Sequence, residues 1–343
     1  MKVDVAVTSR LYVCIPIKKY YPHRPLSWYY GFFPTTTSFL KMGALMTGEA
    51  SPGYLPYPDV PHLIQKRIPG VRIIALGRNP IERMYSSYEY NYVRPTVEEM
   101  QKGRVSHIER NRDDEYYMSF LFSFEEMVAA ELAWLKKCLD PATGSAVVQA
   151  RKKWYSKFTW VRTEMDRREK LNLPPMADLD GYCYGDRVSK EVLRQQWASL
   201  QTDNKDKVIL DHNSHLIQSI IGRSLYVLPL EWWFARFDKE DIHFVCTEEL
   251  SDVSGKGVSR VADFLGLPGF NFSQVVQKGA YNVGGHQGYD NEVAWDIVAN
   301  ETHHASVLKP IPLSEDLLRQ VQSFVQPFNE RLFQMVGKQC QGW

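Results

Sequence analysis

The residues best suited to chemistry lie within one short segment, from Arg78 to Tyr88. An arginine carries a planar set of N–H donors that suits phosphate oxygens, and a serine hydroxyl adds one more donor. Arg78 and Ser86 are therefore candidates to bind one phosphate group together. The alternative is that Arg78 forms a surface ion pair and that Ser86 only packs against its neighbours.

The elements around this segment must bring these side chains together. Residues 71–76 form an apolar, β-branched run after Pro69 and Gly70, which is typical of a buried strand in a parallel sheet. Pro80 suits the first turn of a following helix. Arg78 would then lie at the carboxyl end of the strand, where open α/β sheets bind ligands. The free N–H groups of the helix N-terminus would favour an anion there.

The rest of the chain alternates between strand and helix patterns, which predicts an α/β domain. A polar stretch at about 140–210 is interpreted as an insertion with short helices, and a glycine-rich stretch at 270–292 as a loop. Pro327 is expected to kink or split the last helix, which Ser314 should cap. Helices are predicted over 26–33, 123–139, 214–237, 254–265 and 314–337, and a second buried strand over 241–246.

Composition narrows the function classes. The 41 basic and 40 acidic residues nearly cancel, so a net charge of +1 gives no reason to expect nucleic acid or an anionic membrane as partner. The apolar runs are shorter than the about 18 residues that span a bilayer. The histidines lack ligand spacing, and no metal is expected. Cys138 and Cys183 are candidates for a disulfide or are free thiols, and glycosylation sequons begin at Asn271 and Asn300.

The run Arg78-Asn79-Pro80-x-x-Arg83-x-x-Ser86-x-Tyr88 resembles the 3′-phosphate-binding motif of the sulfotransferases. Those enzymes use PAPS (3′-phosphoadenosine 5′-phosphosulfate) as sulfuryl donor. The resemblance implies that Arg78 and Ser86 hold the 3′-phosphate and that Arg83 supports the loop. It implies a three-layer fold with a central, mostly parallel sheet flanked by helices, similar to the P-loop NTPases, in a single domain over residues 1–343.

Other segments resemble the family in the same order along the chain. Gly48 to Tyr54 is similar to the start of the helix that faces the acceptor sugar in carbohydrate sulfotransferases. Three further segments resemble the family: the one that ends in Tyr226, the loop with Lys278 and Gly279, and the stretch 327–332. Tyr226, Lys278 and Gly279 are therefore expected to contact the cofactor. The pattern is most similar to the Golgi glycosaminoglycan branch, near N-acetylgalactosamine 4-sulfate 6-O-sulfotransferase and the heparan sulfate sulfotransferases.

This resemblance implies transfer of a sulfuryl group from PAPS to a carbohydrate hydroxyl, without a metal, in the Golgi lumen. The acceptor would be a sulfated polysaccharide of the glycosaminoglycan kind, and the protein a glycoprotein. Glu49 is the only carboxylate within a family-like acceptor segment, so it is the candidate for a general base or a sugar contact. The alternative is that Glu49 only stabilises a helix N-terminus through the helix dipole.

One family feature is missing from the sequence. The Pro-Lys-x-Gly-Thr-Thr loop that wraps the 5′-phosphosulfate has no counterpart, and the run from Pro34 to Ser38 imitates it without its lysine and glycine. Two explanations remain open. The chain is N-terminally incomplete and lacks the first strand, this loop and a Golgi anchor, or it is a diverged member that is weakly active or inactive. The first is preferred, because the pattern is otherwise well kept.

Overall fold

The structure is a computed structural model that describes residues 26–51, 54–55, 60–89, 123–138, 170, 172, 220–281, 292–293 and 311–343. The chain divides into two compact units, and each is built from two separate stretches. Unit 1 consists of residues 1–77 and 232–305, and unit 2 of residues 78–231 and 306–343. That the whole chain is one domain stays a prediction. Apart from residues 170 and 172, the predicted insertion at 140–210 falls outside what the structure describes. Cys183 does too, so its pairing with Cys138 stays a prediction.

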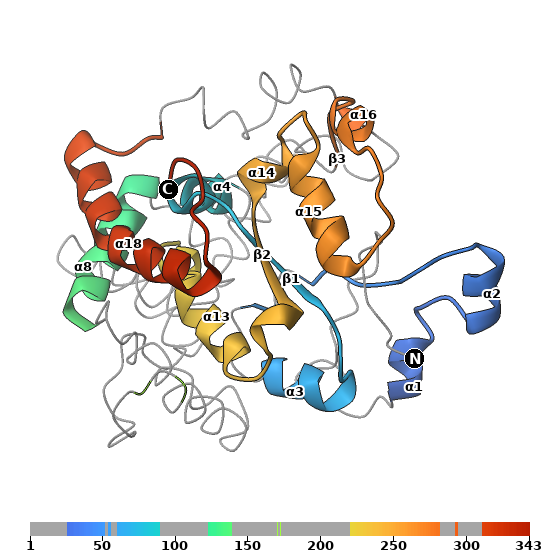
Figure 1. The fold of residues 1–343 in the computed structure, drawn as a ribbon. Coiled ribbons are helices and arrows are strands. Elements are labelled where there is room, and N and C mark those ends of the chain that lie inside the picture. Colours follow the sequence, from blue (N-terminus) through green and yellow to red (C-terminus); the bar gives the residue numbers. More distant parts are fainter. Residues whose placement is uncertain are drawn as a thin grey trace, which may run out of the picture. The chain divides into compact units, whose positions relative to one another are not determined.

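Unit 1 contains a parallel pair of strands (Figure 1). β1 (Ile73–Gly77) pairs with β2 (Ile242–Cys246), with Ile73 opposite Ile242 and Gly77 opposite Cys246. Both strands are short runs of β-branched and apolar residues that fit a pleated, mostly buried surface. The predicted strands at 71–76 and 241–246 and the α/β class are therefore confirmed.

Short helices accompany this sheet in unit 1. α15 (Lys256–Leu265) packs against β2 and ends at Gly266, whose φ of 71° is the left-handed conformation that stops a helix. The prediction of a loop at 270–292 is partly wrong, because this stretch contains α16 and the strand β3, which pairs with β4 in antiparallel fashion. The remaining elements are α1 (Leu26–Tyr30), α2 (Thr36–Lys41), α3 (Val60–Arg67), η4 (Lys239–Asp241), α14 (Thr247–Leu250), α16 (Ser273–Val276), β3 (Ala280–Tyr281) and β4 (Glu292–Val293).

The core of unit 1 is largely aromatic. Tyr29, Trp233 and Phe237 are buried together with aliphatic side chains from α3 and β2. The indole N–H of Trp233 donates to the carbonyl oxygen of Leu55 over 3.1 Å, so the buried ring keeps its polar atom paired. This packing holds Tyr54 and Leu55 next to the sheet, and Tyr54 is one of the two tyrosines that bond the Glu49 carboxylate.

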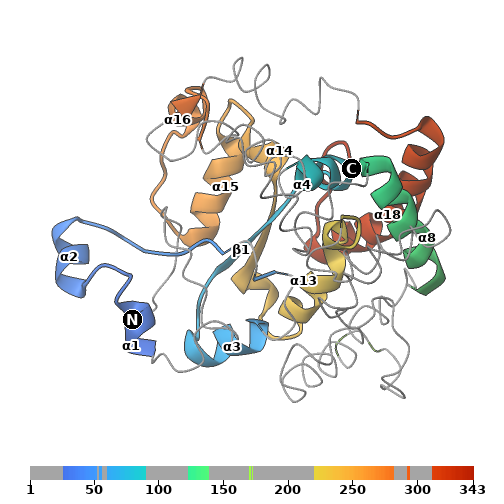
Figure 2. The ribbon, with the colours of Figure 1, turned by 180° about the vertical axis from the view of Figure 1, so that it is seen from behind.

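Unit 2 is helical. It contains α4 (Pro80–Tyr88), α8 (Phe124–Cys138), the 3₁₀ turn η3 (Gly222–Ser224) and α18 (Glu315–Val336), with α8 and α18 side by side in both views (Figures 1 and 2). α18 begins after Ser314 as predicted, but the Ser314 side chain makes no capping hydrogen bond. The expected split at Pro327 is wrong, because the helix continues through it. Pro327 and Ser323, whose carbonyl receives no N–H from a proline four residues later, are both exposed, so this break in the hydrogen-bond pattern is tolerated.

The helix predicted over 214–237 is shorter than expected. α13 (Val227–Phe234) begins only after Leu225, whose φ of −84° and ψ of 68° are not helical. Pro229 lies in the first turn of α13, where a missing N–H is tolerated, so the proline favours a helix start here rather than a helix that runs through. The break leaves residues 220–226 as a compact turn. No helix in the described part of the chain is long and apolar enough to cross a membrane.

Candidate cofactor site

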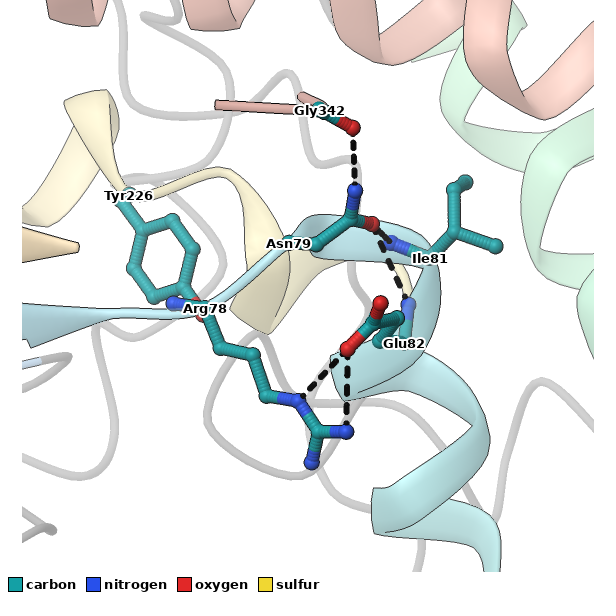
Figure 3. A network of polar contacts seen from close by, with 6 residues as sticks. All are labelled: Arg78, Asn79, Ile81, Glu82, Tyr226 and Gly342. Atoms are coloured by element: carbon teal, nitrogen blue, oxygen red, sulfur yellow. Dashed lines mark hydrogen bonds and ion pairs between the residues drawn. The ribbon is translucent and has the colours of Figure 1, made fainter. Parts of the chain in front are cut away.

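The N-terminus of α4 is capped by Asn79 (Figure 3). Its Oδ1 accepts hydrogen bonds from the N–H groups of Ile81, over 3.0 Å, and Glu82, over 3.3 Å. Pro80 has no N–H, and the N–H of Arg83 donates to the carbonyl oxygen of Asn79. The expectation that this turn offers free N–H groups to an anion is therefore wrong, because an asparagine side chain already accepts from them.

Arg78 precedes this cap and is fixed at both its backbone and its side chain. Its N–H donates to the hydroxyl of Tyr226 over 3.1 Å. Its Nε and Nη2 both donate to Oε2 of Glu82, over 3.2 and 3.1 Å, while the remaining guanidinium nitrogen points away from that carboxylate (Figure 3). The side chain of Arg78 is only 15% exposed, so the ion pair foreseen as an alternative exists but is largely buried.

The turn at 220–226 packs against the start of α4. The hydroxyl of Ser224 donates to the carbonyl oxygen of Pro80 over 3.3 Å, and Nη2 of Arg83 donates to the carbonyl oxygen of Ile220 over 3.2 Å. Tyr226 closes the turn and reaches Arg78. Segments far apart in the sequence thus meet here, and two of the residues expected to contact the cofactor, Arg78 and Tyr226, lie together.

Glu131 of α8 organises this turn and was not foreseen as a functional residue. Its carboxylate is fully buried and accepts three backbone N–H groups, from Ile220 (2.9 Å), Ile221 (3.1 Å) and Gly222 (2.9 Å). A buried carboxylate is stabilised by such donors. One feature of the sequence indicates a buried, paired carboxylate. Glu131 lies three residues after Val128, on the apolar face of the helix, where a charged group needs a partner.

The chain's last residues, Gly342 and Trp343, also contact the cap. Nδ2 of Asn79 donates to the carbonyl oxygen of Gly342 over 2.6 Å (Figure 3). The ring of Trp343 lies 5.5 Å from that of Tyr226 and 6.0 Å from that of Phe333, between ring centroids. Nothing in the sequence pattern indicated this contact.

Glu49 in unit 1 lies in a different environment. It hydrogen-bonds to the hydroxyls of Tyr29 and Tyr54, and burial raises its pKa from 4.5 to about 7 against those two bonds, which lower it. Its Oε2 is buried and has no hydrogen-bond partner among the residues that the structure describes. Glu49 lies outside any described helix, and α3 begins only at Val60, so the interpretation of Glu49 as a helix N-terminal carboxylate is wrong.

Three further candidates for cofactor contacts, Ser86, Lys278 and Gly279, lie in different parts of the chain. Ser86 is half-buried in the last turn of α4. Lys278 is exposed directly after α16, and Gly279 is buried with a φ of 138°, a conformation that favours glycine. Unit 1 holds Glu49, Lys278 and Gly279, and unit 2 holds Arg78, Arg83, Ser86 and Tyr226.

Comparison with known proteins finds three curated relatives. The membrane-associated sulfotransferase kil1 of Dictyostelium discoideum is 21% identical over 256 residues, which cover 73% of this chain and 48% of the relative. The heparan sulfate glucosamine 3-O-sulfotransferases 3B1 and 3A1 of Mus musculus are each 30% identical over 167 residues, covering 47% of this chain and 39% of the relative. The chain thus spans less than half the length of the curated relatives it matches.

Among solved structures, a sulfotransferase from Alicyclobacillus acidocaldarius aligns with a TM-score of 0.39 and 14% sequence identity, over 91% of this chain and 74% of that one. No protein-family model matches the chain.

Proposed function

Because this chain is a low-identity relative of the sulfotransferases, we propose that it transfers a sulfuryl group from PAPS to a hydroxyl of a carbohydrate acceptor. The observation that carries the proposal is the meeting of Arg78 and Tyr226 at the start of α4, within the segment that resembles the family's 3′-phosphate motif. Both side chains were singled out from the sequence, and they come from distant stretches of the chain.

Arg78 and Ser86 are proposed to hold the 3′-phosphate, with Arg83 supporting the turn through Ile220. Because Asn79 occupies the N–H groups of the first turn, the positive charge that balances the phosphate must come from side chains. Lys278 and Gly279 are proposed to close over the nucleotide. The positive φ of Gly279 and the exposure of Lys278 suit a loop whose backbone approaches a phosphate closely.

The proposed transfer is a direct displacement at sulfur. The acceptor oxygen forms the new S–O bond while the bond from sulfur to the 5′-phosphate oxygen breaks, and the hydroxyl proton passes to a base. Glu49 is proposed as that base. Its pKa of about 7 suits proton transfer near neutral pH, and its Oε2 is left to accept a proton while the two tyrosine hydroxyls orient the carboxylate.

The acceptor class and the location are proposed with the function. A glycosaminoglycan-like, sulfated polysaccharide is the proposed acceptor, because the two mouse relatives are heparan sulfate sulfotransferases. The Golgi lumen is the proposed compartment. Two observations support an oxidising, glycosylating environment: Cys246 and Cys340 are disulfide-bonded, and the sequon residue Asn271 is exposed.

A second candidate function is a protein that binds the nucleotide without transferring sulfate. The run at 34–38, which stands nearest to the missing 5′-phosphosulfate loop, forms the start of α2 instead. Thr35 is its N-cap, with Oγ1 accepting from the N–H of Ser38 over 3.2 Å. These hydroxyls serve the helix, and the segment contains neither lysine nor glycine.

Thermal melting with adenosine 3′,5′-bisphosphate tests the cofactor assignment. The ligand should raise the melting temperature, and Arg78→Ala should abolish the increase because the phosphate loses its charged partner. Glu82→Gln is the matched variant. Gln keeps an oxygen that orients Arg78 but removes a negative charge near the phosphate, so this variant should bind about threefold more tightly.

Transfer assays on desulfated glycosaminoglycans then separate the two candidate functions. Stabilisation accompanied by sulfate transfer supports the enzyme, and stabilisation alone supports the binding protein. If the wild-type chain shows no stabilisation by the bisphosphate, the cofactor assignment is wrong.

A further inference from the structure

Gly342 and Trp343 contact two residues next to Arg78: Asn79, which follows it in the chain, and Tyr226, whose hydroxyl accepts its N–H. On one side, the carbonyl oxygen of Gly342 accepts from Nδ2 of Asn79, over 2.6 Å. On the other, the ring of Trp343 lies 5.5 Å from that of Tyr226, whose hydroxyl accepts the N–H of Arg78. Gly342 therefore contacts Asn79, the residue after Arg78, and Trp343 contacts Tyr226, whose side chain is bonded to Arg78.

The contact with Gly342 fixes the orientation of the Asn79 amide. Oδ1 must face the N–H groups of Ile81 and Glu82 for the cap to form. If the amide were turned over, Nδ2 would face those two N–H groups, and donors would oppose donors. A carbonyl oxygen placed next to Nδ2 favours the productive orientation, so Gly342 and the cap of α4 support each other.

The aromatic contact fixes Tyr226 in the same way. Trp343 lies between Tyr226 and Phe333, with interplanar angles of 34° and 49°. Tilted aromatic pairs at these distances attract each other beyond the apolar area they bury. Phe333 belongs to α18, so the helix and the tail together restrict the phenol ring that receives Arg78.

We propose that Gly342 and Trp343 position the 3′-phosphate site, acting through Asn79 and Tyr226 on Arg78 rather than by touching the nucleotide. The inference rests on the proposed function, since it assumes that Arg78 binds the 3′-phosphate. It predicts that Gly342 and Trp343 strengthen the binding of nucleotides that carry a 3′-phosphate and do not affect the binding of nucleotides that lack it.

Calorimetric titration of the full chain with two ligands tests this proposal. Adenosine 3′,5′-bisphosphate carries the 3′-phosphate, and adenosine 5′-phosphosulfate does not. Trp343→Ala should weaken binding of the bisphosphate about tenfold while binding of the phosphosulfate changes less than about twofold. Trp343→Phe should restore most of the loss. Gln339→Ala, an exposed change in the same tail, should alter neither.

Asn79→Ser provides an independent variant. Serine keeps an oxygen that can cap α4 but loses the amide that donates to Gly342, so selective weakening of the bisphosphate is expected again. Unchanged affinity in both variants, or an equal loss for both ligands, overturns the inference and leaves the cofactor assignment standing. If the wild-type chain binds no bisphosphate, the proposed function fails and the inference fails with it.

Discussion

The surroundings of a side chain in this protein change its pKa. Glu49 is an ordinary carboxylate by type, but burial beside Tyr29 and Tyr54 raises its pKa to about 7. The pKa of the Tyr29 phenol is raised as well, by burial and by the nearby Glu49 carboxylate. The sequence could single out Glu49, but not its contact with Tyr29, because Tyr29 belongs to α1, well before Glu49 in the chain.

The raised pKa of Glu49 predicts a pH-dependent stability. A carboxyl whose pKa is about 7 when folded and 4.5 when unfolded binds its proton more tightly in the folded state. Its contribution is therefore fully present below pH 4.5 and is lost as the pH rises through about 7. Glu49→Gln should remove this dependence and raise the free energy of unfolding at pH 8 by about 1–3 kcal/mol. Chemical denaturation at several pH values measures it.

Tyr54→Phe is the control for that experiment. The Tyr54 hydroxyl lowers the pKa of Glu49, so its removal should move the loss of stability to higher pH. The same stability profile in wild type and Glu49→Gln would show that Glu49 does not titrate in this range. If Glu49 is also the base, transfer activity should rise as the pH passes through about 7 and should be lost in Glu49→Gln.

At the scale of elements, the turn at 220–226 depends on one buried carboxylate. Glu131 of α8 accepts N–H groups from Ile220, Ile221 and Gly222, and the turn then presents Ser224 and Tyr226 to α4. Glu131→Gln places an amide NH₂ among these donors. We expect it to lower the free energy of unfolding by about 3 kcal/mol and to weaken binding of the bisphosphate.

Urea unfolding and the bisphosphate titration, compared with Glu125→Gln, check this expectation. Glu125 lies exposed on the same helix, so its replacement should have a much smaller effect. Equal stability of Glu131→Gln and the wild type would contradict the role assigned to the buried carboxylate.

Elements with local signals could be predicted from the sequence, whereas contacts between distant segments could not. β1 and α4 follow from an apolar run, a two-residue link and Pro80, all within a few residues. The capping of α4 by its own asparagine was not predicted, although Asn is a common cap, because the free N–H groups of a helix N-terminus also favour an external anion. The contacts of Glu131 and Trp343 need the tertiary fold, since their partners lie far along the chain.

For the whole molecule, the cysteines predict a dependence on redox conditions. Cys246 is the last residue of β2, Cys340 lies after α18, and both are disulfide-bonded. Reduction should lower the free energy of unfolding by about 2–4 kcal/mol. It should also weaken bisphosphate binding, because Cys340 precedes Trp343 in the tail. Alkylation of the unfolded, unreduced protein followed by mass spectrometry should leave both cysteines unmodified, and their modification would contradict their disulfide-bonded state.

The alternation of the chain between its two units has a consequence for how the protein can be divided. Residues 1–77 and 232–305 make one unit, and 78–231 and 306–343 the other. No continuous stretch of the gene therefore encodes one complete unit without part of the other, and a break at any one peptide bond leaves at least one unit in two pieces. Expressing either half alone should give an insoluble fragment, whereas a nicked protein should remain assembled until it is denatured.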